Sequence, residues 1–278
     1  MEGVWVALLG LLTAGYFALA GVDYGVALLF RVVGRDEVER SRVLGAMTPF
    51  LLGNEVWLVA AVGVLFGAFP RLEGELLSGH HGVFVVVLVG LVAFTAAVQL
   101  RTHPWWDAPL VGGALAVSAG WGVLLGDVLG GPAVLWAFGV PVLFLLHGAV
   151  FLSWRLRGPV RERASRAARV LAWPAAGFVV AAVVLSGPVR EPWCGVGAVL
   201  GVALPLAARV VTRRLAFLCT ATVCAVLPVT VFGAQAVVDV EAMAHTPTLR
   251  ALGWVALVVL PLVGLFQWAT WWVARAAR

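Results

Sequence analysis

Nine long apolar stretches run through this chain of 278 residues, and they constrain its fold more than any other feature. They cover residues 4–30, 49–69, 83–100, 110–129, 133–154, 170–185, 193–211, 215–238 and 252–273. A helix of about 20 apolar residues crosses a bilayer, whereas an open strand leaves backbone groups without partners in lipid. The sequence therefore predicts an all-α integral membrane protein with nine transmembrane helices, in a single polytopic domain over residues 1–278.

The composition excludes a soluble protein. Hydrophobic residues make up 62% of the chain and charged residues only 12%, against about 25% charged residues in soluble domains. Nine spans use about 180 positions, which leaves no room for a soluble catalytic domain. This chain is therefore expected to hold no complete catalytic site, and any chemistry must occur among the helices or in a partner.

The positive charge lies mainly in the connections between the apolar stretches. Nineteen arginines carry all of it, because the chain has no lysine. The first, third, fifth and seventh connections and the C-terminus hold sixteen of them. Cytoplasmic loops retain arginine, so we expect the N-terminus outside and the C-terminus in the cytoplasm. This dispersal indicates membrane topology and not nucleic-acid binding. The longest polar connection, residues 155–169, is expected to be solvated and to contact anionic lipid.

Three polar residues stand inside the apolar stretches near the predicted cytoplasmic side: Asp23, Asn54 and Glu55. Ionisable groups at membrane depth are costly and usually face a bundle interior or a water path. One interpretation is a carboxylate pair, Asp23 with Glu55, that takes up protons. The other is an interhelical polar cluster, in which Asn54 donates to a carbonyl and an acid pairs with an inner-loop arginine. The sequence leaves both open.

His147 lies in the middle of the fifth stretch. A haem or metal ligand needs partners, and no second His, Met or Cys stands in an obvious position to join it. A neutral, hydrogen-bonded histidine is therefore the expectation, and no metal site is predicted. Several acidic residues at the ends of stretches are expected to be solvated: Asp107, Asp127, Asp239 and Glu241.

Glycines recur four residues apart in four of the stretches. This spacing lets helix backbones approach closely, so we expect these positions on packed faces and not on faces toward lipid. The pairs are Gly21 with Gly25, Gly63 with Gly67, Gly122 with Gly126, and Gly197 with Gly201.

Four segments in the first quarter of the chain carry a resemblance to a known family. They are GVDYGV (21–26), GRDEVERSR (34–42), GNEVW (53–57) and GVLFGAFP (63–70). In order and spacing they resemble the N-terminal region of subunit II of cytochrome bd-type quinol oxidases, with Gly53 and Trp57 inside the most specific segment. The similarity continues through Arg101 and Trp106, then through 147–158, 246–250, 254–261 and 267–273.

The resemblance implies a heterodimer in the bacterial cytoplasmic membrane. Subunit I of that family carries haems b and d and the quinol site, whereas subunit II has no haem ligands and no such cofactor of its own. Subunit II folds as two four-helix bundles plus a peripheral helix, packs beside subunit I and contributes to proton delivery. Membrane lipid, a bound quinone and small accessory subunits are compatible with this arrangement.

Four positions depart from the family pattern, because neutral residues stand where the family usually has ionisable ones. They are Ala20, Leu52, Phe94 and Gln99. The position of Leu52 usually holds an aspartate implicated in the proton path of the family. The usual path is therefore expected to be altered or absent, although Asp23 and Glu55 remain.

Three hypotheses follow. The first is a subunit II of a bd-type quinol:oxygen oxidoreductase that stabilises subunit I and assists cytoplasmic proton uptake past Asp23 and Glu55. The second is a purely structural subunit of a modified bd-like complex with no proton pathway of its own, which the lost acids favour. The third is a secondary transporter, against which stand the odd number of spans and the lack of a visible inverted repeat.

Overall fold

The computed structural model describes every residue except 1, 187–191, 234–242 and 277–278. The described residues form helices and contain no strand. Side chains are described except those of residues 2, 187–197, 231–242 and 275–278. The elements are α1 (Glu2–Val33), α2 (Glu37–Ala68), α3 (Pro70–Gly79), α4 (His81–Leu100), η1 (Pro104–Trp106), α5 (Asp107–Val128), α6 (Ala133–Arg155), α7 (Gly158–Leu185), α8 (Pro192–Ala207), α9 (Arg213–Gly233) and α10 (Thr246–Ala276).

Eight helices in the described part of the chain are long and apolar enough to cross a membrane. They are α1, α2, α4, α5 with η1, α6, α7, α9 and α10. The expected span 193–211 falls on α8, whose described apolar segment, Ala198–Ala207, is shorter than a span. The end of the expected span 215–238 lies outside the described residues. An all-helical membrane fold is therefore confirmed, and the ninth crossing stays a prediction.

Two helices begin well before the apolar stretches that predicted them. The connection between α1 and α2 comprises only residues 34–36, because the Asp36 side chain accepts a hydrogen bond from the backbone N–H of Glu39 (2.8 Å) and caps α2. Likewise α7 begins at Gly158, which has a φ of +69°, and carries a proline in its first turn. Most of residues 155–169, which the apolar stretches placed in a connection, is therefore part of α7, and several of its residues are exposed, as the expected solvation requires.

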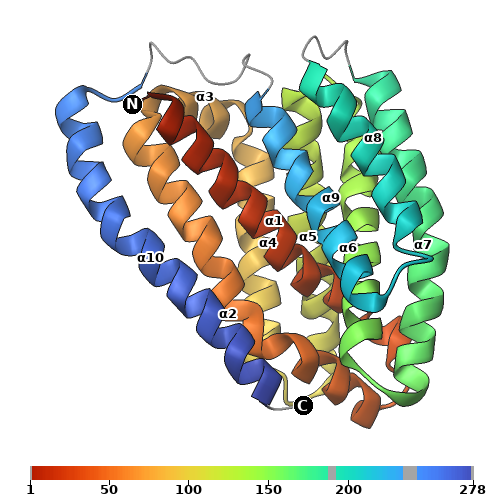
Figure 1. Cartoon of the computed structure of the whole chain (residues 1–278). Coiled ribbons are helices and arrows are strands. Elements are labelled where there is room, and N and C mark those ends of the chain that lie inside the picture. Colours follow the sequence, from red (N-terminus) through yellow and green to blue (C-terminus); the bar gives the residue numbers. More distant parts are fainter. Residues whose placement is uncertain (1, 187–191, 234–242, 277–278) are drawn as a thin grey trace.

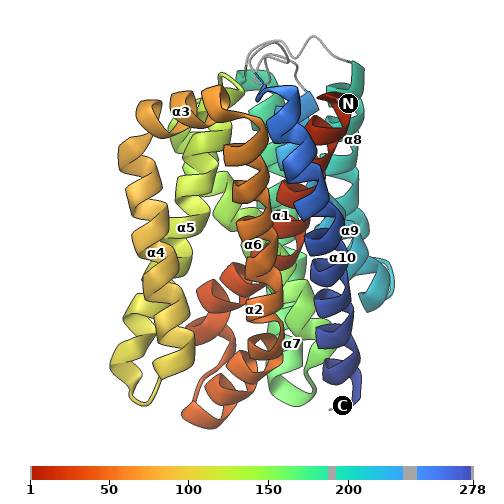
Figure 2. The same ribbon diagram turned by 90° about the vertical axis from the view of Figure 1, so that its left-hand side faces the viewer.

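Helix α1 lies at the centre of the assembly, where it packs against α2, α5, α6 and α9. Neighbours in sequence also pair, since α4 packs on α5, α6 on α7, and α8 on both α7 and α9. Helix α10 lies at one side, where its extensive contacts are with α2 (Figure 1). The short α3 crosses the end of the bundle between α2 and α4 (Figure 2), in the segment between the second and third apolar stretches.

A close backbone approach joins α1 to α6 at Gly25 and Gly148. A Cβ atom at Gly25 would lie 1.8 Å from the carbonyl oxygen of Phe144, and one at Gly148 would lie 2.4 Å from the carbonyl carbon of Gly25. Only glycine permits this crossing, as expected for small residues at membrane helix contacts. The packed face predicted for Gly25 is confirmed, but Gly63 faces open space.

The other described glycines of the predicted pairs also lie against neighbouring helices. Gly21 faces the Phe144 ring, and Gly122 and Gly126 lie against Trp136, which closes α5 onto α6. Gly67 and Gly201 meet side chains of other helices, whereas the side-chain position of Gly197 lies outside the described residues.

Candidate functional site

Asp23 and Asn54 meet between α1 and α2, and both side chains are buried. The Nδ2 atom of Asn54 donates to Oδ2 of Asp23 (2.8 Å) and lies 3.2 Å from the carbonyl oxygen of Leu19. The other carboxylate oxygen of Asp23, Oδ1, is buried and has no hydrogen-bond partner among the described residues. Asp23 is thus held by an amide, and the expected pairing with an arginine is not found there.

Helix α10 joins this cluster through Gln267. Its side-chain amide lies 3.2 Å from Oδ1 of Asn54 and 3.3 Å from Nε1 of Trp57. With the amide turned over, Gln267 instead donates to the carbonyl oxygen of Gly53 (3.0 Å) and accepts from Trp271 (3.1 Å). Either orientation bonds α10 to the centre of α2. Asn54 therefore bonds α2 to α1 and lies in contact with Gln267 of α10.

Glu55 follows Asn54 directly but belongs to a different contact. Its Oε1 accepts a hydrogen bond of 2.7 Å from the hydroxyl of Thr95 on α4, and the side chain is half-buried. Successive helical residues point about 100° apart, so Asn54 faces α1 while Glu55 faces α4. Asp23 and Glu55 therefore have separate partners, on different faces of α2.

A second polar group on α1 was not found by sequence reasoning. The hydroxyls of Tyr16 and Tyr24 lie 2.8 Å apart, and Nε1 of Trp121 on α5 donates to the Tyr16 hydroxyl at 3.2 Å. Both tyrosines are fully buried. These are the only two tyrosines in the chain, eight positions apart, and that spacing was the signal available in the sequence.

His147 is fully buried on α6 and also contacts α1. Its Nε2 lies 2.9 Å from the carbonyl oxygen of Ala18, and its Nδ1 lies 2.7 Å from the hydroxyl of Thr220 on α9. A carbonyl can only accept, so Nε2 carries the proton and Nδ1 accepts from the threonine. Both ring nitrogens are therefore used in joining three helices.

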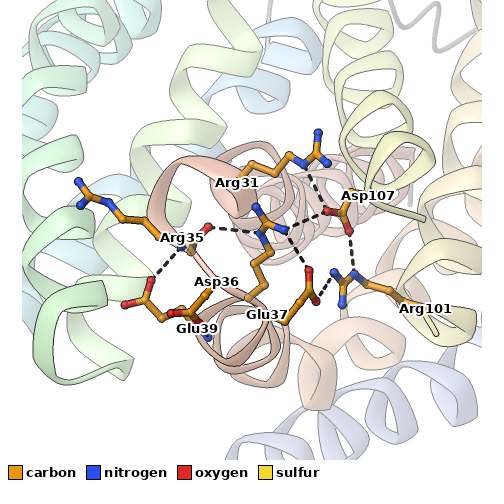
Figure 3. A network of polar contacts seen from close by, with 9 residues as sticks. Arg31, Arg35, Asp36, Glu37, Glu39, Arg101 and Asp107 are labelled. Atoms are coloured by element: carbon orange, nitrogen blue, oxygen red, sulfur yellow. Dashed lines mark hydrogen bonds and ion pairs between the residues drawn. The ribbon is translucent and has the colours of Figure 1, made fainter. Parts of the chain in front are cut away.

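A larger ionic cluster lies at the end of the bundle where α1 meets α2 (Figure 3). Asp107, the first residue of α5, accepts from Nε of Arg101 (2.9 Å) and from Nε of Arg31 (3.2 Å). Arg101 also donates to Glu37 (2.8 Å), which in turn pairs with Arg40 (3.0 Å). The expectation that Asp107 is solvated is wrong, because its side chain is buried under these arginines.

Arg101 is the organising residue of this cluster. Burial alone would lower the pKa of its guanidinium, but hydrogen bonds to Glu37 and Asp107 outweigh burial and raise that pKa. The guanidinium also lies 5.0 Å from the centroid of the Phe30 ring. Nearby, Arg163 of α7 bonds Glu39 and the carbonyl oxygen of Val33. The arginines of this end therefore fasten the α1–α2 connection to α5 and α7.

The other expected end-of-span acids have separate outcomes. Asp127 is largely exposed, in agreement with the expectation, and its Oδ2 lies 2.7 Å from Nε2 of His80. Asp239 and Glu241 lie outside the described residues. Among the described residues, no cluster of His, Cys, Asp or Glu has the arrangement of a metal site.

Comparison with known proteins assigns the family. The profile of the family described as cytochrome bd terminal oxidase subunit II matches residues 1–274. The chain belongs to this family. The membership that the sequence motifs predicted is thereby confirmed, and with it a multi-pass protein of the bacterial membrane.

Relatives and a solved structure agree with this assignment. The chain is 29% identical over 195 residues to cytochrome bd ubiquinol oxidase subunit 2 of Bacillus subtilis (strain 168), covering 61% of this chain and 58% of that protein. It is 32% identical over 135 residues to cytochrome bd-I ubiquinol oxidase subunit 2 of Escherichia coli (strain K12), covering 46% and 36%. The matches thus span less than two thirds of either relative. A chain in the structure of bd oxidase from Geobacillus thermodenitrificans has the same fold, with a TM-score of 0.63, 16% identity and coverage of 95% and 96%.

The GNEVW segment of this chain packs α2 against two other helices. A Cβ at Gly53 would lie 3.2 Å from Oε1 of Gln267, so a larger residue would press on α10. The Trp57 ring covers Gly15 of α1, where a Cβ would lie 2.1 Å from it. Together with Asn54, these residues hold α1 and α10 to the two sides of α2.

The four neutral positions of this family member lie in different surroundings. Ala20 and Phe94 are buried, with the Phe94 ring 5.1 Å from that of Tyr24. Leu52 is 57% exposed on the outer face of the helix assembly, and Gln99 is also exposed. Two of the four positions are therefore in the core of the helix assembly and two are on its surface.

Proposed function

We propose that this chain is the haem-free subunit II of a bd-type quinol:oxygen oxidoreductase in the bacterial cytoplasmic membrane. The match to the subunit II family over residues 1–274 carries the proposal. In this assignment, electrons pass from quinol to oxygen through haems b and d of the haem-bearing subunit I. The chain itself stabilises that partner. Both nitrogens of His147 are already bonded within the protein, which supports placing the haems in subunit I.

The proposed arrangement is two four-helix bundles plus a peripheral helix. Packing among α1, α2, α4 and α5, and among α6, α7, α8 and α9, supports the two bundles, and the position of α10 against α2 supports the peripheral role. The arginine distribution supports placing the α1–α2 connection and the C-terminus in the cytoplasm. The start of α1 and the end of α10 lie at opposite ends of the bundle (Figure 1), which supports an odd number of crossings.

Asp23 is the residue through which we propose that the subunit assists proton uptake. Asn54 fixes Oδ2, whereas the buried Oδ1 has no protein partner among the described residues. A buried oxygen without a donor is costly, and a proton on that oxygen removes the negative charge. Glu55 is the second acid of the proposed route, because it is half-buried and one residue from Asn54.

Substitution of the two acids tests this role in the assembled complex. We expect Asp23→Asn and Glu55→Gln each to lower quinol-dependent oxygen consumption, by about 100-fold where the acid is an obligatory proton carrier. Glu75→Gln is the matched control, because this acid of α3 is 69% exposed and pairs with the exposed Arg71 at the surface. Full turnover of both variants in an intact complex would contradict the proton role and leave a purely structural subunit.

A further inference from the structure

Six arginines surround one pocket at the end of the bundle that carries the α1–α2 connection. The pocket has a volume of about 810 Å³ and lies between the start of α2, the α6–α7 connection and the start of α9. The arginines that line it are Arg42, Arg155, Arg157, Arg161, Arg213 and Arg214. The volume falls within the range of about 300–1,000 Å³ that is usual for small-ligand sites.

No acidic residue among the described residues lines this pocket. One of its six arginines, Arg155, is held by the carbonyl oxygen of Ala274 (3.2 Å), and the other five carry the argument. In the neighbouring cluster of Figure 3, by contrast, Arg31, Arg40 and Arg101 each contact a carboxylate. Like charges held together repel one another, so an anion in the pocket would stabilise the folded protein.

Other features of the pocket also fit an anion. Arg157 is the N-cap of α7 and makes no side-chain capping bond, so the first N–H groups of α7 have no side-chain acceptor from their cap. The positive end of that helix therefore opens beside the arginines. Trp154 and Leu156 form an apolar wall, as suits a ligand at the edge of the membrane, where tryptophan is typical.

A second, smaller pocket extends the same basic surface. It shares Thr212 and Arg213 with the first and adds Arg169 and Arg209. Arg209 is held in place over the Trp173 ring, with its guanidinium carbon 4.8 Å from the ring centroid. The basic surface is therefore long enough to contact more than one phosphate group.

We propose that this arginine pocket binds an anion with two phosphate groups. Guanidinium groups match phosphate oxygens in a bidentate manner, and basic pockets between membrane helices on the cytoplasmic side bind such headgroups. The two sources of this chemistry are the headgroup of cardiolipin, a dimeric phospholipid, and a free diphosphate. The apolar wall of Trp154 and Leu156 favours the lipid.

The test uses the complex purified through this subunit. The pocket variant is Arg157→Gln with Arg214→Gln, since both side chains are exposed and line the pocket. The control variant is Arg35→Gln with Arg166→Gln, which removes the same charge from exposed positions at the same end that do not line it. Melting temperatures are measured in phosphatidylcholine vesicles with increasing cardiolipin and, separately, in detergent with inorganic pyrophosphate.

Cardiolipin is expected to raise the melting temperature of the wild-type complex and of the control. In the pocket variant, the amount needed for half of this rise increases by roughly 30-fold, since each arginine near the surface contributes about 1 kcal/mol. If only cardiolipin raises the melting temperature, the ligand is the lipid headgroup. If pyrophosphate also raises it, and the pocket variant again needs more than the control, the ligand is a soluble anion. The proposal is overturned if neither anion stabilises the wild type, or if the control loses as much as the pocket variant.

Discussion

At the scale of single residues, Asn54 brings together polar groups from three helices. It is the only asparagine in the chain, and its amide contacts Asp23, the backbone of Leu19 and Gln267. Hydrogen bonds of this kind between membrane helices are individually modest. Because the Asn54 side chain contacts both α1 and α10 from α2, its loss is expected to weaken two helix contacts at once.

Replacing Asn54 with leucine removes the donor to Asp23 as well as the contact with Gln267. We expect Asn54→Leu to lower the free energy of unfolding by about 2 kcal/mol, because a buried carboxyl oxygen loses its partner. Thermal unfolding of the purified complex measures the change. Thr222→Val serves as control, since the exposed Thr222 hydroxyl bonds only within its own helix. Equal stability of the two variants would show that the hydrogen bonds of Asn54 do not stabilise the protein.

Only part of this cluster was readable from the sequence. Asp23, Asn54 and Glu55 stood out because polar groups are rare inside apolar stretches. Their partners did not, because Thr95 and Gln267 lie far along the chain and a single sequence does not reveal contacts between distant helices. The separation of Asp23 from Glu55 also depends on the rotation of α2 between its neighbours, which apolar length does not fix.

At the scale of elements, apolar length located the helices but not their ends. Hydropathy indicates which residues lie in lipid. A helix can continue beyond the lipid into water, and its end is marked by a capping residue. Two signals marked the true starts: Asp36 three residues before Glu39, which is typical of a capping box, and Gly158 followed by Pro159. Both occur in polar segments, where the apolar stretches gave no information.

The crossing of α1 and α6 is the contact most sensitive to side-chain size. Gly25→Ala places a Cβ 1.8 Å from the Phe144 carbonyl oxygen, so the helices must separate. We expect a loss of about 3 kcal/mol in unfolding free energy, measured by thermal unfolding. Gly63→Ala is the matched control, since nothing lies within 4 Å of its added Cβ. A Gly25→Ala protein as stable as Gly63→Ala would contradict this packing.

Asp107 and Asp127 stand at opposite ends of α5 and offer a second matched comparison. Asp107→Asn removes the negative charge between Arg31 and Arg101, whose guanidinium groups then lose their buried partner. The expected cost is about 3 kcal/mol, seen as a lower denaturation midpoint of the complex. Asp127→Asn should cost less than about 1 kcal/mol, because this side chain is 63% exposed. Equal costs would indicate that the Asp107 cluster is no more than a surface network.

At the scale of the whole molecule, the fold persists at low sequence identity. A solved bd oxidase chain superposes with a TM-score of 0.63 at 16% identity. Membrane folds depend on span length, arginine placement and close helix contacts more than on individual residues. The sequence could predict these features. It could not predict how the chain meets the proposed subunit I, since that surface depends on a second protein.

The absorption spectrum of the complex purified through this subunit tests the central claim most directly. Because this chain is proposed to be haem-free and to depend on a haem-bearing partner, an affinity-tagged copy should bring down a second membrane protein. The purified complex should show the bands of haems b and d and oxidise quinol with oxygen. A colourless protein that purifies alone in a stable, folded state would contradict the account.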